Sequence, residues 1–254
     1  MSKKTKDKIA VVIPVINLWD KYTKRTLESI KSEDNELIFI IIDNNSIDKT
    51  KEEAEKRQGE NFVYIRNDKN IGVASSWNLG IKKGIEKDCE YFFIINNDLL
   101  FQSNTIDTIV KRFHNNTKEE NIGIITAHNI QGELDSPQDI FDYDYRKKID
   151  IPESEHPDFS AFMLTKKCYN EVGQFDENFY PAYFEDNDYH YRLYLKGIKA
   201  INYPMAVYYH FGSRSKKFIN NFNTLFEKNR EYYKKKWGGI PGEEIFKSPF
   251  NSDL

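Results

Sequence analysis

The decisive stretch of this sequence is Tyr91-Phe92-Phe93-Ile94-Ile95-Asn96-Asn97-Asp98-Leu99-Leu100, an apolar and aromatic run that ends in three polar residues before apolar residues resume. The first five residues are too few to cross a membrane, and they predict a strand that is buried on both faces. The polar residues then lie at the carboxyl end of that strand. Because open α/β sheets bind their ligands at this end, the stretch predicts a site as well as a strand. A polar turn without a ligand is the alternative interpretation, since Asn and Asp are common in turns.

The composition indicates a globular protein and excludes some partners. With 254 residues the chain can form one large α/β domain, or a domain with an appendage. The net charge of −3 provides no basic footprint for nucleic acid, so we expect none as a partner. Phe and Tyr dominate an aromatic share of 15%, which is enough for both a core and flat surfaces that fit sugars or bases.

Cysteines and apolar runs bear on localisation. Cys89 and Cys168 are far apart in the sequence, so they indicate neither a disulfide framework nor a zinc site, and a reducing compartment is expected. Residues 1–8 are basic, but the short apolar run after them contains Pro14 and no cleavage site, which argues against a signal peptide. No run approaches the length of a transmembrane helix. We therefore expect a cytoplasmic protein without a transmembrane segment, for which peripheral contact with the inner membrane face stays open.

Strand and helix patterns alternate along the first hundred residues. The expected strands are residues 9–15, 37–42, 62–65 and 90–95, and the expected helices are residues 21–30, a segment ending at Lys56 that Ser46 or Asp48 caps, and residues 73–85. This alternation predicts right-handed βαβ units, and therefore an α/β fold with a mostly parallel, Rossmann-like central sheet flanked by helices.

The second half is less regular. Its expected strands are residues 122–126, 161–164 and 200–209, and its expected helices are residues 186–195 and 219–237, the latter ended by Gly238 and Gly239. Residues 129–157 form an acidic connection of a length that is usually functional or mobile. We expect one domain over residues 1–215, with a nucleotide-binding half at about 9–100 and a catalytic half at about 101–215, followed by a C-terminal helix and tail at 216–254.

Polar side chains follow three of the expected strands. Asn17 comes after the first strand, Asp43 and Asn45 after the second, and Asn96–Asp98 after the fourth. A carboxylate at the Asp43 position can accept the ring N–H of uracil, thymine or guanine. The alternative is a turn that enters the next helix, because Asp, Asn and Ser are common capping residues.

The same edge of the sheet contains candidate metal ligands. Asp98 and Asn96 have the spacing of a pair of ligands at a strand end, and His210 follows a later strand. One carboxylate indicates a loosely held ion, Mn²⁺ or Mg²⁺, whose remaining positions go to phosphates and waters. Arg214, with the lysines after it, could neutralise a diphosphate. A structural histidine and solvated cations are the alternatives.

Residues 180–188 are the richest stretch for catalysis, because aromatic residues lead directly into an acidic helix start. Acidic residues stabilise a helix N-terminus by about 0.3–1 kcal/mol each, which explains them without any function. In the functional interpretation the helix N-terminus keeps the pKa of a carboxyl low, so that it is ionised as a general base must be. Tyr180 and Tyr183 would then offer flat faces to a sugar.

Seven motifs in this order resemble the family 2 glycosyltransferases with the GT-A fold, and an eighth segment resembles their C-terminal helix. The motifs are residues 11–17, 42–50, 70–80, 96–98, 172–176, 185–188 and 210–213, followed by residues 229–238. No single motif is specific, but the order is, and the resemblance covers roughly residues 9–237.

The resemblance implies inverting transfer from a nucleoside-diphosphate sugar, UDP- or dTDP-type favoured, to a hydroxyl group of a glycan, lipid-linked glycan or protein acceptor, as in glycan or polysaccharide synthesis. It implies Asp186 as the general base. It also implies that a substrate-binding set lines the site, comprising Val15, Asn17, Asp43, Asn45, Asn70, Asn78, Asn97, Asp98, Tyr183, Glu185 and Arg214, with a divalent metal at Asp98, His210 and Asn96. The acceptor side is expected at residues 129–157 and the aromatics near Tyr180.

One departure from the family pattern concerns the metal. Asn96 stands where the family has its first acid, and a neutral ligand lowers metal affinity. This variant resembles the rhamnosyltransferase-like branch of the family.

Two alternatives stay open. A nucleotidyltransferase of similar fold would normally have a Gly-rich basic loop after the first strand, whereas this chain has Asn17-Leu18-Trp19-Asp20. A nucleotide-sugar-binding protein without transferase activity is the other alternative, against which the intact Asp98 and Asp186 argue. The donor sugar, the acceptor, the linkage and the oligomeric state are not specified by the sequence.

Overall fold

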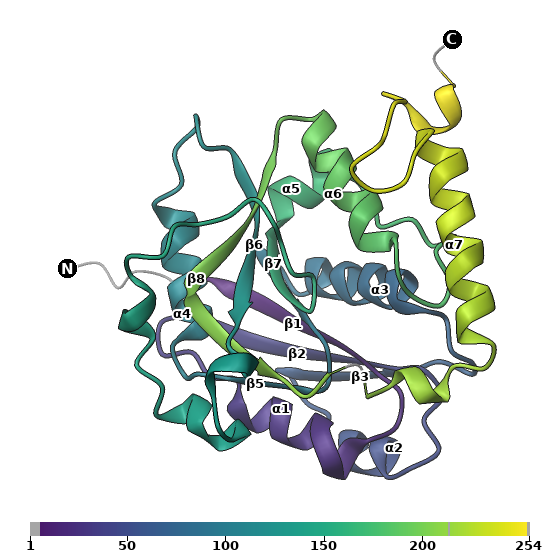
Figure 1. The fold of residues 1–254 in the computed structure, drawn as a ribbon. Coiled ribbons are helices and arrows are strands. Elements are labelled where there is room, and N and C mark those ends of the chain that lie inside the picture. Colours follow the sequence, from purple (N-terminus) through teal and green to yellow (C-terminus); the bar gives the residue numbers. More distant parts are fainter. Residues whose placement is uncertain (1–5, 213, 253–254) are drawn as a thin grey trace.

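The computed structural model describes residues 6–212 and 214–252 and contains one eight-stranded sheet of order β3-β2-β1-β4-β7-β6-β8-β5 (Figure 1). The strands are β1 (Lys8–Val15), β2 (Glu36–Asp43), β3 (Phe62–Arg66), β4 (Tyr91–Ile95), β5 (Leu99–Phe101), β6 (Ile122–Asn129), β7 (Ala161–Thr165) and β8 (Lys199–His210). The first four form a parallel block, as the βαβ pattern predicts. β6 and β8 are also parallel, while β7 and β5 run antiparallel to their neighbours. The predicted mostly parallel α/β fold is confirmed.

Helices cover both faces of the sheet (Figure 1). They are α1 (Lys24–Ser29), α2 (Thr50–Glu55), α3 (Val73–Glu86), α4 (Thr105–His114), α5 (Lys166–Val172), α6 (Glu185–Leu195) and α7 (Phe222–Trp237). Side chains from α1, α2 and α4 share one buried cluster with one face of β1, and those from α3, α5 and α6 share a second cluster with the other face. Strand residues are therefore buried on both sides, which is why β1, β2 and β4 are continuous apolar runs.

Glycine allows α3 to lie very close to β1. A Cβ placed on Gly80 would lie 2.2 Å from the Val12 Cγ1, and one on Gly84 would lie 2.7 Å from the Ala10 Cβ. The helix that follows the strand β3 can therefore pack directly on the central strand, which fixes the position of its N-terminal residues beside the strand ends.

Several elements differ from the sequence expectation. The helix expected at 21–30 is one turn of π-helix, η1 (Trp19–Thr23), followed by α1, and the sequence analysis did not identify β5, α4 or α5. Asp48, rather than Ser46, accepts the Thr50 N–H at the start of α2, at 3.0 Å. β5 has only three residues, so its apolar run is too short to be distinguished from a continuation of the preceding turn.

The connection at 129–157 is ordered as three short 3₁₀ helices, η2 (Gln131–Glu133), η3 (Pro137–Phe141) and η4 (Tyr145–Lys148). Ile130 and Ile140 pack in a small buried cluster with Leu100 of β5 and Val207 of β8. The connection therefore covers the edge of the sheet at which β5 lies.

The helix α7 packs back on the domain. Its Tyr233 and Trp237 join Phe179, Phe184 and Tyr191 in a buried aromatic cluster with α6 and the loop before it. Figure 1 shows α7 in yellow-green at the side of the sheet, alongside α6. The division at residue 215 into a domain and an extension stays a prediction. Among the described residues, no helix is both long and apolar enough to span a membrane.

Candidate active site

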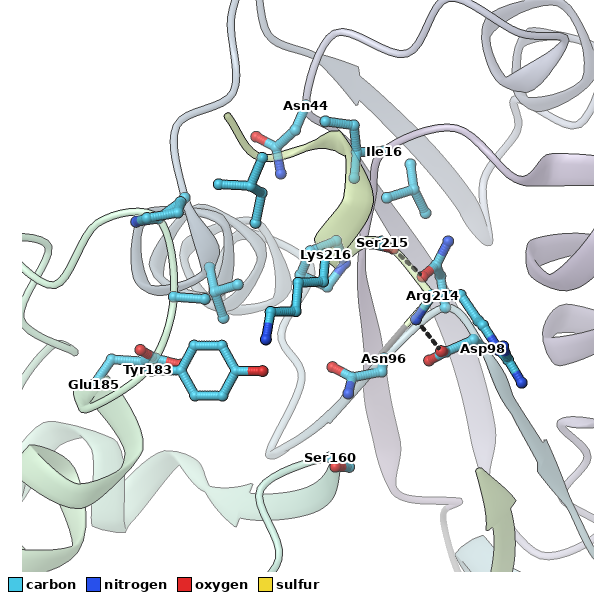
Figure 2. A pocket seen from close by; sticks show the side chains of 18 of the residues that line it. Ile16, Asn44, Asn96, Asp98, Ser160, Tyr183, Glu185, Arg214, Ser215 and Lys216 are labelled. Carbon is cyan, nitrogen blue, oxygen red and sulfur yellow. Dashed lines mark hydrogen bonds between the residues drawn. The ribbon is translucent and has the colours of Figure 1, made fainter. Parts of the chain in front are cut away.

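A cavity of about 260 Å³ lies at the carboxyl ends of the central strands. Ten of the fourteen predicted site residues line it: Val15, Asn70, Asn96, Asn97, Asp98, Tyr183, Glu185, Asp186, His210 and Arg214. In Figure 2, Tyr183 and Glu185 face Asn96 and Asp98 across the cavity, and Lys216 reaches in between. The fold therefore brings together polar side chains that lie more than a hundred residues apart.

The polar turn after β4 is held by hydrogen bonds to α1 and to the last residue of η1. The Thr26 hydroxyl donates to the carbonyl oxygens of Asn97 and Leu99, at 2.9 and 2.8 Å, and the Asn97 amide donates to the Thr23 Oγ1 at 3.0 Å. Asn97 and Asp98 are nearly inaccessible to solvent apart from the cavity. Residues 96–98 therefore form a polar turn and also line a cavity, so both interpretations of the sequence apply to them.

The short strand β5 brings His210 to Asp98. Leu99 pairs with His210 in the antiparallel β5–β8 ladder, and the Phe211 N–H donates to the Asp98 carbonyl oxygen at 3.0 Å. The His210 Nε2 then lies 3.3 Å from the Asp98 Oδ1. This ring nitrogen is buried and has no hydrogen-bond partner among the described residues. The Asp98 Oδ2 is already used, because it accepts the Arg214 N–H at 3.1 Å.

These residues fit a divalent cation as a small, open donor set. An unpartnered imidazole nitrogen and a carboxylate oxygen point to one place, and the Asn96 side chain lines the same cavity. The carboxylate of Asp98 and the amide carbonyl of Asn96 are ligands that suit Mg²⁺ or Mn²⁺. No group of three or more His, Cys, Asp or Glu side chains in residues 6–212 and 214–252 is arranged to hold a metal. Any cation here would therefore depend on ligands from a substrate, which agrees with the low metal affinity expected from the neutral Asn96.

The acidic start of α6 forms the opposite wall of the cavity. Tyr183 and Phe184, just before it, have φ of 77° and 74°, a left-handed conformation that costs a residue other than glycine about 1–3 kcal/mol. This sharp turn places both Glu185 and Asp186 on the cavity. The Asp186 Oδ1 accepts the Asn187 N–H at 2.9 Å.

The low pKa that the sequence analysis expected for Asp186 is wrong. Burial raises the pKa of Asp186, and the charge of Asp158 adds to this, while hydrogen bonds from the backbone only partly oppose it. The helix N-terminus is therefore outweighed by loss of hydration. A raised pKa suits a general base better than a low one, because proton transfer is most efficient when the pKa lies near the working pH.

Glu185 is a buried carboxyl with one unpartnered oxygen. It is 5% exposed, and no described residue forms a hydrogen bond with its Oε2. Burial, reinforced by the charge of Asp186, raises the pKa of Glu185 well above its ordinary value of 4.5. Between that ordinary value and the raised one, the folded state holds a proton that the unfolded state has lost, so stability falls as the pH rises.

We expect Glu185→Gln to stabilise the protein in a pH-dependent way. The gain in unfolding free energy over wild type should be near zero at pH 4 and largest at pH 8, on the order of 1–3 kcal/mol for relief of an unpaired buried group. Urea unfolding at the two pH values measures it, with the exposed Glu171→Gln on α5 as the control. A gain of equal size at both pH values would show that the carboxyl charge is not its cause.

The region at the end of β2 is built differently from the prediction. Asp43 is 0% exposed and does not line the cavity, since its Oδ2 accepts from the Tyr64 hydroxyl at 2.6 Å and from Arg66 at 2.5 Å. Asn45 accepts from the same guanidinium, and Asn17 accepts the Ile47 N–H. The contact of these three residues with the substrate stays a prediction, and for Asp43, which is predicted to contact the base, it requires displacement of Arg66 or Tyr64.

Asn78 belongs to the packing rather than to the cavity. Its amide donates to the Phe175 carbonyl and to Glu177, at 2.9 and 2.8 Å, and its Oδ1 accepts the Phe175 N–H at 2.9 Å. These hydrogen bonds tie α3 to the loop before α6, and the predicted contact of Asn78 with the substrate stays a prediction. Tyr180 also does not line the cavity, nor does any residue of 129–157. Ser213, in the 210–213 motif, lies outside the described residues.

Asp158 and Asn44 line the cavity but were not predicted as site residues from the sequence. Asp158 lines the cavity, and its two oxygens accept from the Tyr208 hydroxyl at 2.6 Å and the Ser160 N–H at 2.9 Å. Asn44 lines the cavity at the other end, where its Oδ1 accepts the Ile71 N–H at 3.1 Å. Asn44 stands in the polar run after β2 and was detectable there, whereas Asp158 follows an irregular segment and carries no local signal.

Comparison with known sequences decides the family. The profile described as "Glycosyl transferase family 2" matches residues 10–173, which is more than half of the chain. The chain belongs to glycosyl transferase family 2. A galactofuranosyl glycosyltransferase of Leishmania donovani is 26% identical over 188 residues, or 60% of this chain and 43% of that protein. The predicted family and enzyme class are thereby confirmed.

Solved structures of other glycosyltransferases share the fold of this family 2 member. TarS of S. aureus (residues 1–349) has a TM-score of 0.58 at 17% identity, over 83% of this chain and 62% of that chain. The mannosyltransferase PcManGT from Pyrobaculum calidifontis, solved with GDP-Man and Mn²⁺, has a TM-score of 0.59 at 12% identity, over 87% and 60%. GalNAc-T7, solved with UDP, GalNAc and Mn²⁺, has a TM-score of 0.61 at 14% identity, over 92% and 51%.

The glycosyltransferase spans only part of these relatives. It covers less than two thirds of both the curated relative and TarS. The match to the family profile contains Asp43 and Asp98 but ends before Asp186 and His210. The roles of these last two residues therefore rest on the geometry of the cavity.

Proposed function

We propose that this glycosyltransferase moves a sugar from a nucleoside-diphosphate sugar to a hydroxyl group, with inversion at the anomeric carbon. The observation that carries the proposal is the placement of Asp98 and His210 on one wall of a single cavity and of Glu185 and Asp186 on the other. A diphosphate held at the first wall directs its sugar toward the second. PcManGT was solved with GDP-Man and GalNAc-T7 with UDP, which supports a donor of this class.

Asp186 is the proposed general base. Its carboxylate takes the proton of the acceptor hydroxyl as that oxygen bonds to the anomeric carbon, on the face opposite the diphosphate. The bond from the anomeric carbon to the diphosphate oxygen breaks, and the electron pair leaves with the diphosphate. A single displacement of this kind inverts the configuration.

The opposite wall stabilises the departing charge. Arg214 and Lys216 line the cavity beside Asp98, so their charges lie where the diphosphate leaves. Asp98, His210 and Asn96 would hold Mn²⁺ or Mg²⁺, which would supply Lewis-acid neutralisation of the diphosphate oxygens. Mn²⁺ is present in the structures of PcManGT and GalNAc-T7, which supports this assignment.

Substrate identity is proposed at the level of class. We favour a UDP- or dTDP-type donor, as the family resemblance implies. The Asp43 carboxylate at the end of β2 could accept the ring N–H of uracil or thymine, as well as that of guanine, once it is released from Arg66. The acceptor is a glycan, a lipid-linked glycan or a protein, in glycan or polysaccharide synthesis. A cytoplasmic location with peripheral membrane contact stays a prediction.

A two-step experiment tests the proposal. We expect thermal unfolding to shift upward with UDP or dTDP and their sugars, more with Mn²⁺ or Mg²⁺ than without, because a ligand that binds only the folded state stabilises it. The donor should also be hydrolysed slowly when no acceptor is present. NMR should show that the released sugar first has the anomeric configuration opposite to that in the donor. Retention of the anomeric configuration would overturn the single displacement. An increase in melting temperature with GDP but not with UDP or dTDP would overturn the proposed nucleobase of the donor.

A further inference from the structure

The C-terminal helix α7 contacts the loop that enters α6. Asn229, in the middle of α7, is 1% exposed, and its amide donates to two consecutive carbonyl oxygens, of Ala182 at 3.0 Å and of Tyr183 at 3.2 Å. One side-chain amide thus uses both of its hydrogens on neighbouring peptide units. This arrangement fixes the direction in which both peptide planes face.

The peptide units that Asn229 holds adjoin the unfavourable backbone of the loop. Tyr183 and Phe184 both have left-handed φ, although neither is glycine. Such a conformation persists only where the surroundings hold it in place. The hydrogen bonds from Asn229 are therefore one of the forces that keep this turn from relaxing.

A second contact from α7 lies two residues beyond Asp186. The Lys236 Nζ lies 2.5 Å from the Asp188 Oδ1 and 2.6 Å from the Asp176 Oδ2, and the Trp237 Nε1 donates to the Asp188 Oδ1 at 2.8 Å. Lys236 and Asp188 are both buried. Asp186 thus lies between two anchors on one helix, at the loop before it and at the residue two positions after it.

We propose that Asn229 is a positioning residue for glycosyl transfer: it holds the 182–184 backbone so that Asp186 faces the reacting sugar. The inference rests on the proposed role of Asp186 as the base. It gives α7, which lies beyond the 10–173 family match, a part in the chemistry although Asn229 does not line the cavity.

Kinetics of Asn229→Ala test the proposal. We expect kcat to fall on the order of 10²-fold, the cost of displacing a reacting group by about 1 Å. The affinity for UDP, measured by calorimetry, should not change, because the proposed diphosphate contacts, Asp98, His210 and Arg214, lie across the cavity from this loop. The acid limb of the pH profile should also move to lower pH, since a loosened loop lets water reach Asp186 and removes part of what raises its pKa. Asn229→Leu, which keeps about the same size but has neither a donor nor a charge, should behave alike.

Two controls separate positioning from loss of stability. Asn223→Ala changes an exposed Asn on the same helix and should leave every measurement unchanged. Tyr191→Phe removes a hydroxyl that donates to the Phe246 carbonyl, which fastens α6 to the tail without touching the loop. It should lower the melting temperature but leave kcat and the pH profile unchanged.

The failure of this inference differs from the failure of the proposed function. Full kcat and an unmoved pH profile in both Asn229 variants would overturn the positioning role, while Asp186→Asn stayed inactive. The positioning role would also be overturned if Tyr191→Phe had the same melting temperature as Asn229→Ala and lost as much kcat. General destabilisation would then explain the effect. An active Asp186→Asn would instead overturn the role of the base itself.

Discussion

Asp186→Asn is expected to lower kcat on the order of 10²–10⁴-fold, the usual contribution of a general base. The substitution keeps the shape of the side chain and removes its ability to take a proton. Affinity for the nucleotide should persist, because Asp186 lies on α6, across the cavity from Asp98 and His210. Initial rates and calorimetric titration of UDP on the same preparation measure the two quantities separately.

The pH dependence of the wild type supplies a second test of the same residue. Because burial raises the pKa of Asp186, kcat/KM should fall on the acid side once the pH drops below that raised value and the base is protonated. The variant should lose this limb along with its activity. Asp88→Asn, an exposed site at the end of α3, is the control and should match wild type. Normal turnover by Asp186→Asn would exclude the residue as the base.

Asp98→Ala is expected to weaken both the nucleotide and the metal. It removes the one carboxylate of the donor set and the acceptor of the Arg214 N–H, so both the cation and the phosphate-side loop lose a contact. Removal of a residue that only hydrogen-bonds to a metal ligand lowers metal affinity by roughly 10–100-fold. Removal of Asp98, a proposed ligand itself, should lower it at least as much. Calorimetry with Mn²⁺, in the presence and absence of UDP, measures it.

Asn96→Asp provides the opposite change at the same site. It restores a second carboxylate, so metal affinity should rise and less Mn²⁺ should be needed for half-maximal activity. If the activity of Asp98→Ala responded to Mn²⁺ as wild type does, the metal would not be held by Asp98. If Asn96→Asp left the response unchanged, Asn96 would not be a ligand.

Most of the fold followed from local patterns. The strands β1, β2 and β4 were predictable because burial on both faces makes their sequences continuously apolar. The short strand β5 and the seven-residue α5 were not, because three to seven residues contain too little periodicity to distinguish an element from a loop. The π-turn at Trp19–Thr23 was also invisible, since its residues fit an ordinary helix equally well.

Some residues of the candidate site were also predictable from the sequence, and others were not. Residues directly after a strand, such as Asn97 and Asp98, were found because the ends of parallel strands share one edge of the sheet. Asn78 was assigned to the substrate because of the resemblance, but its partners Phe175 and Glu177 lie almost a hundred residues away and use its amide for packing. Asp158 was missed because only its contact with Tyr208 on β8 brings it to the cavity.

The sequence by itself determined the α/β class, the glycosyltransferase family and the edge of the sheet at which polar residues gather. These depend on local periodicity and on the order of motifs along the chain. Only the tertiary structure decided that β5 brings His210 to Asp98, that burial raises the pKa of Asp186, and that α7 holds the loop before α6. These depend on pairing, desolvation and hydrogen bonds between residues far apart in the sequence, which no local pattern specifies.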